Sequence, residues 1–86
     1  MSDIAIMGGI AADIEGRPDG MLIYADSNPG KIKISYGGVS RNITENLARL
    51  GADVSFCSIA GNDFIGRAAK QQLESLGADV SGVKLE

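Results

Sequence analysis

A six-residue segment occurs twice in this chain, and it constrains the possible folds more than any other feature. Leu50-Gly51-Ala52-Asp53-Val54-Ser55 returns unchanged as Leu76-Gly77-Ala78-Asp79-Val80-Ser81. Glycine readily adopts the left-handed conformation that ends a helix, so each copy predicts the end of a helix and the start of a strand. This predicts alternating strands and helices, the order typical of a parallel sheet with right-handed crossovers.

Three strands and two helices follow from this pattern. Short apolar runs predict strands at 4–7, 54–59 and 80–85. The first predicted helix follows a double glycine, with an inner face of Ile43, Leu47 and Leu50 beside Ala48. The second begins at Asp63, a good helix N-cap, with an inner stripe of Ile65, Ala69, Leu73 and Leu76.

Residues 14–36 interrupt this alternation. They contain two turn-forming clusters, around Pro18-Asp19-Gly20 and Asp26-Ser27-Asn28-Pro29-Gly30, followed by a run that alternates polar and apolar residues. We therefore expect a small ribbon inserted into a core of residues 1–13 and 37–86, all within one domain. A three-stranded parallel sheet needs cover on its faces and edges, so the pattern resembles part of a larger domain.

Composition narrows the range of functions. The 86 residues carry a net charge of -3 with no basic stripe, which argues against a nucleic-acid polymer as partner. A single cysteine excludes an internal disulfide, and no histidine is available for metal binding or general-base work. Neither a signal peptide nor an apolar run long enough to cross a membrane is visible, so we expect a cytoplasmic protein.

Asp13 is the first candidate binding residue. It follows the first predicted strand, at the edge where open α/β sheets bind ligands. Its carboxylate offers two acceptor oxygens, which match a pair of adjacent hydroxyls on a ribose ring. A solvated loop aspartate is the alternative interpretation.

Asn42, one turn into the first predicted helix, is the second candidate. Its amide could donate to a sugar hydroxyl, while the N–H groups of Gly37 and Gly38 bind a ligand oxygen at the helix N-terminus. The run Asn42-Ile43-Thr44-Glu45 equally fits a capping box, in which Asn42 only caps the helix and Glu45 reaches back.

Three further polar residues are candidates for ligand contact. Arg41 reaches a ligand or phosphate, or else is a solvated arginine in the first turn of the helix. Ser27 and Asn28 lie in the second turn cluster, where they cover a ligand or simply form a surface turn.

Three segments of the chain resemble the ribokinase-like (PfkB-type) sugar and nucleoside kinases. Gly8-Gly9-Ile10-Ala11-Ala12-Asp13 looks like the family's opening strand and sugar-binding aspartate. The run from Gly37 to Gly61 matches the first family signature in the spacing of Asn42, Thr44, Gly51 and Gly61. Ser40 departs from that signature, which usually has Gly, Ala or Pro there. Gly61-Asn62-Asp63-Phe64-Ile65-Gly66 is similar to the segment that opens the family's next helix.

The resemblance implies the N-terminal part of a ribokinase-like fold, with a parallel β-α-β-α-β core and an inserted β-lid. It implies ATP-dependent, Mg²⁺-assisted phosphorylation of a sugar or nucleoside. Within the family, the segment 25–42 is most similar to sequences that act on pseudouridine, at its 5′-hydroxyl. Asp13, Gly38 and Asn42 would then hold the sugar. Ser27, Asn28 and Lys31 would lie on the lid, through which members of the family often dimerise.

The family's Gly-Ala-Gly-Asp motif, which carries the catalytic aspartate, does not occur in this sequence. We therefore expect the ATP site and the catalytic residues outside this chain, and no kinase activity from the chain alone. A kinase for ribose or fructose and a non-catalytic module that pairs through the ribbon remain alternatives. An unrelated dinucleotide-binding domain is disfavoured, because Gly8-Gly9 lacks the third glycine of that fingerprint.

Overall fold

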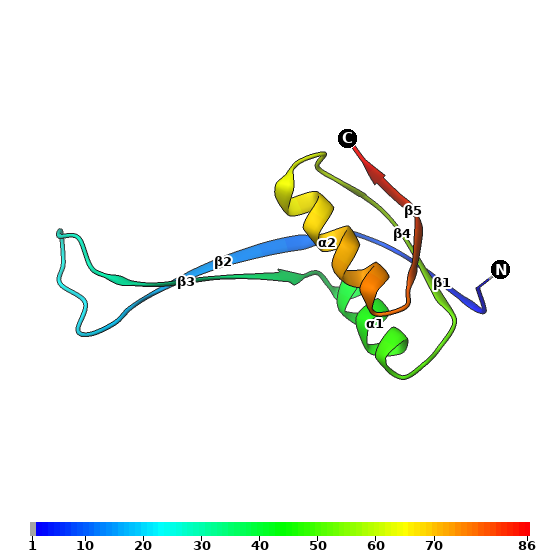
Figure 1. The fold of residues 1–86 in the computed structure, drawn as a ribbon, viewed down its shortest axis with the longest axis horizontal. Coiled ribbons are helices and arrows are strands. Elements are labelled where there is room, and N and C mark those ends of the chain that lie inside the picture. Colours follow the sequence, from blue (N-terminus) through cyan, green and yellow to red (C-terminus); the bar gives the residue numbers. More distant parts are fainter. Residues whose placement is uncertain (1) are drawn as a thin grey trace.

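The computed structural model describes residues 2–86, and three parallel strands form its main sheet (Figure 1). The strands lie in the order β1-β4-β5, with bounds Ile4–Met7, Val54–Ala60 and Asp79–Leu85. Ile4 is opposite Val54, and Met7 is opposite Cys57. The predicted parallel core is therefore confirmed.

Both helices pack against the same face of this sheet. α1 spans Val39–Arg49 and α2 spans Phe64–Ser75. Successive right-handed crossovers that advance in one direction place their helices on one side. Between the helices and the sheet lies a single apolar cluster that includes Ala48, Phe56, Leu73 and Val83. The opposite face leaves Met7 and Ile59 largely exposed.

The repeated segment forms the same helix end twice. In the first copy Ala52 N–H donates to Leu47 C=O and Gly51 N–H to Ala48 C=O, which is the Schellman pattern. The second copy repeats both bonds one helix later, from Ala78 and Gly77 to carbonyl groups of α2. The two glycines have φ of 84° and 98°. Local sequence alone therefore ends both helices.

The predicted inner face of α1 is confirmed at Ala48, which is buried, and at Leu47, which is half-buried against the core, but it is wrong at Ile43 and Leu50. The helix buries Arg41, Thr44 and Ala48, whereas Ile43 is 44% exposed and Leu50 is 83% exposed. Burial of the two polar residues is possible because both find hydrogen-bond partners. The inner stripe of α2 is confirmed at Ala69 and Leu73, which are buried, and its ends at Ile65 and Leu76 are half-buried.

The inserted ribbon consists of two antiparallel strands, β2 and β3, that project away from the sheet and helices (Figure 1). They span Ala11–Pro18 and Gly30–Gly37. The ribbon therefore begins three residues before the expected boundary at residue 14, and Asp13 lies within its first strand. One face carries Ile14, Ile32 and Ile34, and the other carries mostly charged residues. Within residues 2–86, neither helix has the length and apolar character needed to cross a bilayer.

Candidate functional site

The junction between β3 and α1 is built from two glycines. β3 ends at Gly37, and Gly38, with φ of 98°, precedes the first helical residue, Val39. A Cβ on Gly38 would lie only 2.8 Å from the carbonyl oxygen of Gly9. Residues with a side chain rarely adopt this φ, so glycine is required both by conformation and by space. The close approach brings the start of α1 against the connection between β1 and β2.

A hollow of about 340 Å³ lies at this junction, lined by Gly9, Ile10, Ala11, Gly38, Val39 and Ser40. It follows the carboxyl end of β1, where ligands of open α/β sheets bind. The first backbone N–H groups of α1 have no acceptor inside the helix and carry partial positive charge. The hollow is therefore suited to a ligand that presents oxygen acceptors.

Ser40 anchors the first turn of α1 to the sheet. Its hydroxyl donates to the carbonyl oxygen of Met7 at 3.2 Å, and its side chain occupies the space that a Cβ on Gly8 would need. The Thr44 hydroxyl in turn donates to the Ser40 carbonyl oxygen at 2.9 Å. The departure from the family signature at Ser40 thus adds a hydrogen bond between the helix start and β1.

Asp13 lies beside the glycine junction. It is the third residue of β2 and pairs with Ser35 across the ribbon. Its Oδ2 lies 3.1 Å from the position that a Cβ on Gly37 would occupy. The side chain is exposed, and its carboxylate accepts no hydrogen bond within residues 2–86. The missing side chain of Gly37 therefore leaves room for a carboxylate with free acceptor oxygens at the start of α1.

Asn42 is not the cap of α1, so the capping-box alternative is wrong. The N-cap is Gly38, without a side-chain hydrogen bond, and the backbone N–H of Asn42 donates to the Gly38 carbonyl oxygen at 2.9 Å. Glu45 pairs with Arg41 and Arg49 instead of reaching back. Because Gly38, with φ of 98°, directly follows the strand and precedes the first helical residue, the helix starts before the polar residues that could cap it. The Asn42 side chain is exposed on the first turns of α1.

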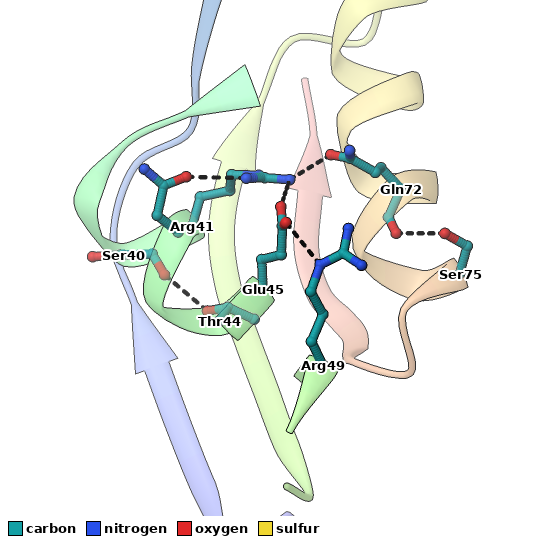
Figure 2. Close-up of polar contacts among 8 residues, drawn as sticks. Ser40, Arg41, Thr44, Glu45, Arg49, Gln72 and Ser75 are labelled. Carbon is teal, nitrogen blue, oxygen red and sulfur yellow. Dashed lines mark hydrogen bonds and ion pairs between the residues drawn. The ribbon is translucent and has the colours of Figure 1, made fainter. Parts of the chain in front are cut away.

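Arg41 is only 4% exposed, so the alternative of a solvated arginine is also wrong. Figure 2 shows its guanidinium between α1 and α2. Its Nη2 is 2.5 Å from Gln72 Oε1 and 2.5 Å from Glu45 Oε1, and its Nη1 is 3.0 Å from Asn42 Oδ1. Three protein side chains therefore hold this guanidinium in a fixed orientation.

The carboxylate of Glu45 is the anionic centre of this network (Figure 2). Arg49 Nε lies 2.9 Å from its Oε2, on the side opposite to Arg41. Hydrogen bonds from Arg49 and Arg41 lower the pKa of Glu45 below its ordinary value of 4.5, although desolvation opposes the shift. The carboxylate therefore stays ionised at neutral pH and balances the buried charge of Arg41.

Ser27 and Asn28 lie at the far end of the ribbon, away from the hollow (Figure 1). The Asn28 amide is used within the turn itself, because Nδ2 donates to the Ile23 and Asp26 carbonyl oxygens and Oδ1 accepts from Ile23 N–H. The structure thus brings Asp13 to the Gly37-Gly38 junction but leaves the turn residues apart from it. Contact of Ser27 or Asn28 with a ligand stays a prediction.

The polar network around Arg41 was missed from the sequence. Gln72 was not among the candidate residues, yet its side-chain oxygen accepts a hydrogen bond from Arg41 across the two helices. The spacing of Arg41, Glu45 and Arg49 is the one signal that could have revealed the network, since residues four apart are neighbours on a helix. Nothing in the sequence pattern marks Gln72 as their partner.

The structure is an α/β domain in which an inserted ribbon carries an acidic residue beside the start of α1, at the carboxyl edge of a parallel sheet. A model of the pfkB family carbohydrate kinases matches residues 1–86. The chain belongs to that family.

Two curated relatives and one solved structure agree with this assignment. Pseudouridine kinase of Escherichia coli (strain K12) is 44% identical over 77 residues, which cover 90% of this chain and 25% of that protein. Guanosine-inosine kinase of Exiguobacterium acetylicum is 40% identical over 85 residues, or 99% of this chain and 28% of that protein. A putative sugar kinase from Clostridium perfringens superposes with a TM-score of 0.88 at 33% identity, covering 99% of this chain and 27% of that chain.

These comparisons confirm the expected ribokinase-like fold and family. The chain spans about a quarter of the length of the relatives that it matches.

Proposed function

We propose that this chain forms the substrate-binding part of a longer kinase that phosphorylates the 5′-hydroxyl of a nucleoside, with pseudouridine as its substrate. The observation that carries the proposal is the position of the Asp13 carboxylate beside the Gly37-Gly38 junction. The two curated relatives support the nucleoside class, because the names of both describe kinases of nucleosides. Kinases for another sugar, such as ribose or fructose, are the competing members of the family.

The chemistry of the site fits a ribose ring. An ionised carboxylate accepts hydrogen bonds from two neighbouring hydroxyls, so Asp13 would hold the ring diol. Asn42 would donate to a hydroxyl oxygen, and the backbone at Gly38 would approach the ring closely because no side chain intervenes. Phosphoryl transfer depends mainly on positioning of the acceptor and on electrostatic stabilisation. These residues would supply the positioning.

ATP is the phosphoryl donor that we propose, with Mg²⁺ as its companion ion. Within residues 2–86 no group of three His, Cys, Asp or Glu side chains could hold a metal ion. We assign no residue of this chain to ATP or Mg²⁺, and because the family's Gly-Ala-Gly-Asp motif does not occur in this sequence, we expect the purified 86-residue chain to form no product. ATP-dependent product from that chain alone would contradict this expectation.

The test compares substrates and one variant in the full-length protein. We expect ATP-dependent phosphorylation with a higher kcat/KM for pseudouridine than for guanosine, inosine, ribose or fructose. Asp13→Asn should raise KM for the nucleoside, because a charge-assisted hydrogen bond becomes neutral at a cost of roughly 1–3 kcal/mol, or about 5- to 150-fold. Asp19→Asn, at the distal end of the ribbon, is the matched control and should leave KM unchanged. An unchanged KM in Asp13→Asn would remove Asp13 from the site.

The apolar face of the ribbon supports a second proposal, pairing of two copies of the protein. Ile14, Ile32 and Ile34 share this face and are 64%, 76% and 46% exposed. An exposed apolar ribbon of this kind is a common site of strand or sheet association. Ile32→Glu should convert a dimer of the full-length protein to a monomer in analytical ultracentrifugation, whereas Lys33→Glu on the opposite face should not. A monomeric wild-type protein would refute the pairing.

A further inference from the structure

We propose that Arg41 is a positioning residue: it holds the Asn42 side-chain amide so that the NH₂ group, not the oxygen, is presented to the substrate. This inference rests on the proposed function, since it assumes that Asn42 contacts the nucleoside. It replaces the expectation that Arg41 itself binds the ligand.

The first step is the orientation of the Asn42 amide. Arg41 Nη1 lies 3.0 Å from Asn42 Oδ1. A guanidinium has donors and no acceptor, so only the oxygen of the amide can face it. Asn42 Nδ2 donates no hydrogen bond within residues 2–86. The side chain is exposed, and the NH₂ group is therefore the part left for a ligand.

The second step is the rigidity of Arg41. Neighbouring side chains on a helix normally diverge, so contact between residues 41 and 42 requires the arginine to be held in an unusual direction. Gln72 on α2 and Glu45 one turn along α1 supply that restraint, each 2.5 Å from Nη2 (Figure 2). The residue is 96% buried by these contacts and the surrounding helices. Because packing of the two helices fixes the guanidinium, the guanidinium in turn fixes the orientation of the Asn42 amide.

The third step is electronic. A cation bound to the amide oxygen draws electron density from the nitrogen, because the hydrogen bonds of a chain polarise one another. The NH₂ group of Asn42 becomes a better donor to a hydroxyl oxygen of the substrate. Asp13 can only accept when ionised. The two residues together then require a hydroxyl-bearing ring that accepts at one position and donates at another.

A double-mutant cycle in the full-length protein, with pseudouridine as the probe, tests this inference. Arg41→Met removes the donor and the charge with little loss of volume, and we expect it to raise the Kd about tenfold. In an Asn42→Ala background the same substitution should change the Kd by less than about twofold, since there is no amide left to orient. An equal effect in both backgrounds, or no effect in either, would overturn the inference.

Arg49→Gln is the matched control, because it removes another arginine bound to Glu45 on the same helix without a contact to Asn42. It should leave the Kd unchanged in both backgrounds. Failure of the proposed function gives a different result: Asn42→Ala and Asp13→Asn would each bind pseudouridine as tightly as the wild type. That outcome refutes the site and the positioning role together.

Asn42→Asp keeps the test decisive if Arg41→Met does not fold. The new carboxylate still accepts from Arg41, so thermal stability should be retained, but the donor to the substrate is lost. We expect the Kd of Asn42→Asp to rise as much as that of Asn42→Ala. Wild-type affinity in Asn42→Asp would show that the amide nitrogen is not the group presented to the substrate.

Discussion

Removal of the Glu45 carboxylate would leave the buried guanidinium of Arg41 without its counter-ion. Loss of one partner of a buried ion pair typically costs 3–5 kcal/mol. Here the Glu45 side chain keeps 21% exposure, and Arg41 retains its contacts with Gln72 and Asn42. We therefore expect Glu45→Ala to lower the free energy of unfolding by about 3 kcal/mol. Glu45→Gln keeps one acceptor oxygen and should cost about 1–2 kcal/mol.

The pH dependence of this effect has a defined sign. The folded-state pKa of Glu45 is lower than its ordinary value of 4.5, so ionised Glu45 stabilises the folded state. That contribution is fully present above the unfolded pKa and is lost as the pH falls through the folded pKa. The stability difference between the wild type and Glu45→Gln should therefore be constant above about pH 4.5 and shrink in more acidic solution, because a protonated glutamate resembles glutamine.

Urea unfolding of the full-length protein, followed by circular dichroism between pH 3 and pH 8, would measure both effects. Arg49→Ala is the control, since it breaks the exposed pair of the same network and should cost only about 0.2–1 kcal/mol. If Glu45→Ala cost no more than Arg49→Ala, the reasoning that Glu45 neutralises a buried charge would be refuted.

Three further substitutions test the scaffold, each by urea unfolding of the full-length protein. Asp63→Ala removes the acceptor for Gly66 N–H, 2.7 Å away, and should cost about 1 kcal/mol; no loss would mean that the cap is dispensable. Leu73→Ala empties a fully buried position and should cost about 2–5 kcal/mol, against under 0.5 kcal/mol expected for a surface site. Gly38→Ala must adopt φ of 98° beside the Gly9 carbonyl oxygen and should cost about 1–3 kcal/mol; wild-type stability would show that the junction tolerates a side chain.

The sequence was sufficient for features that depend on a few neighbouring residues. The two copies of Leu-Gly-Ala-Asp-Val-Ser both form Schellman ends, and Asp63 caps α2 as expected. Such motifs close their hydrogen bonds within one helical turn, so the residues that decide them are adjacent in the chain. The parallel order of the strands followed from the same signals.

The helix follows the double glycine as expected, but the role of Asn42 at its start could not be predicted in this way. The polar run from Asn42 to Glu45 has the form of a cap, but the helix begins at Val39 because Gly38 packs against Gly9. That contact joins segments distant in the chain, and the local pattern holds no trace of it. The position of Asp13 within β2 likewise depends on pairing with β3. This pairing starts the ribbon at Ala11, before the expected boundary at residue 14.

Arg41 shows the difference most clearly. An arginine in the first turn of a helix is exposed in most proteins, and the spacing of Arg41, Glu45 and Arg49 indicates ion pairs along the helix but does not indicate burial. Its environment is decided by Gln72, which α2 brings alongside, and by Glu45, whose charge offsets the cost of desolvation. Local hydrogen bonding and residue spacing were thus enough to predict the helix ends, the order of the strands and the family. Which polar side chains are buried, and in what direction they point, follows from the packing of one helix on another, because burial and pairing energies arise between segments far apart in the chain.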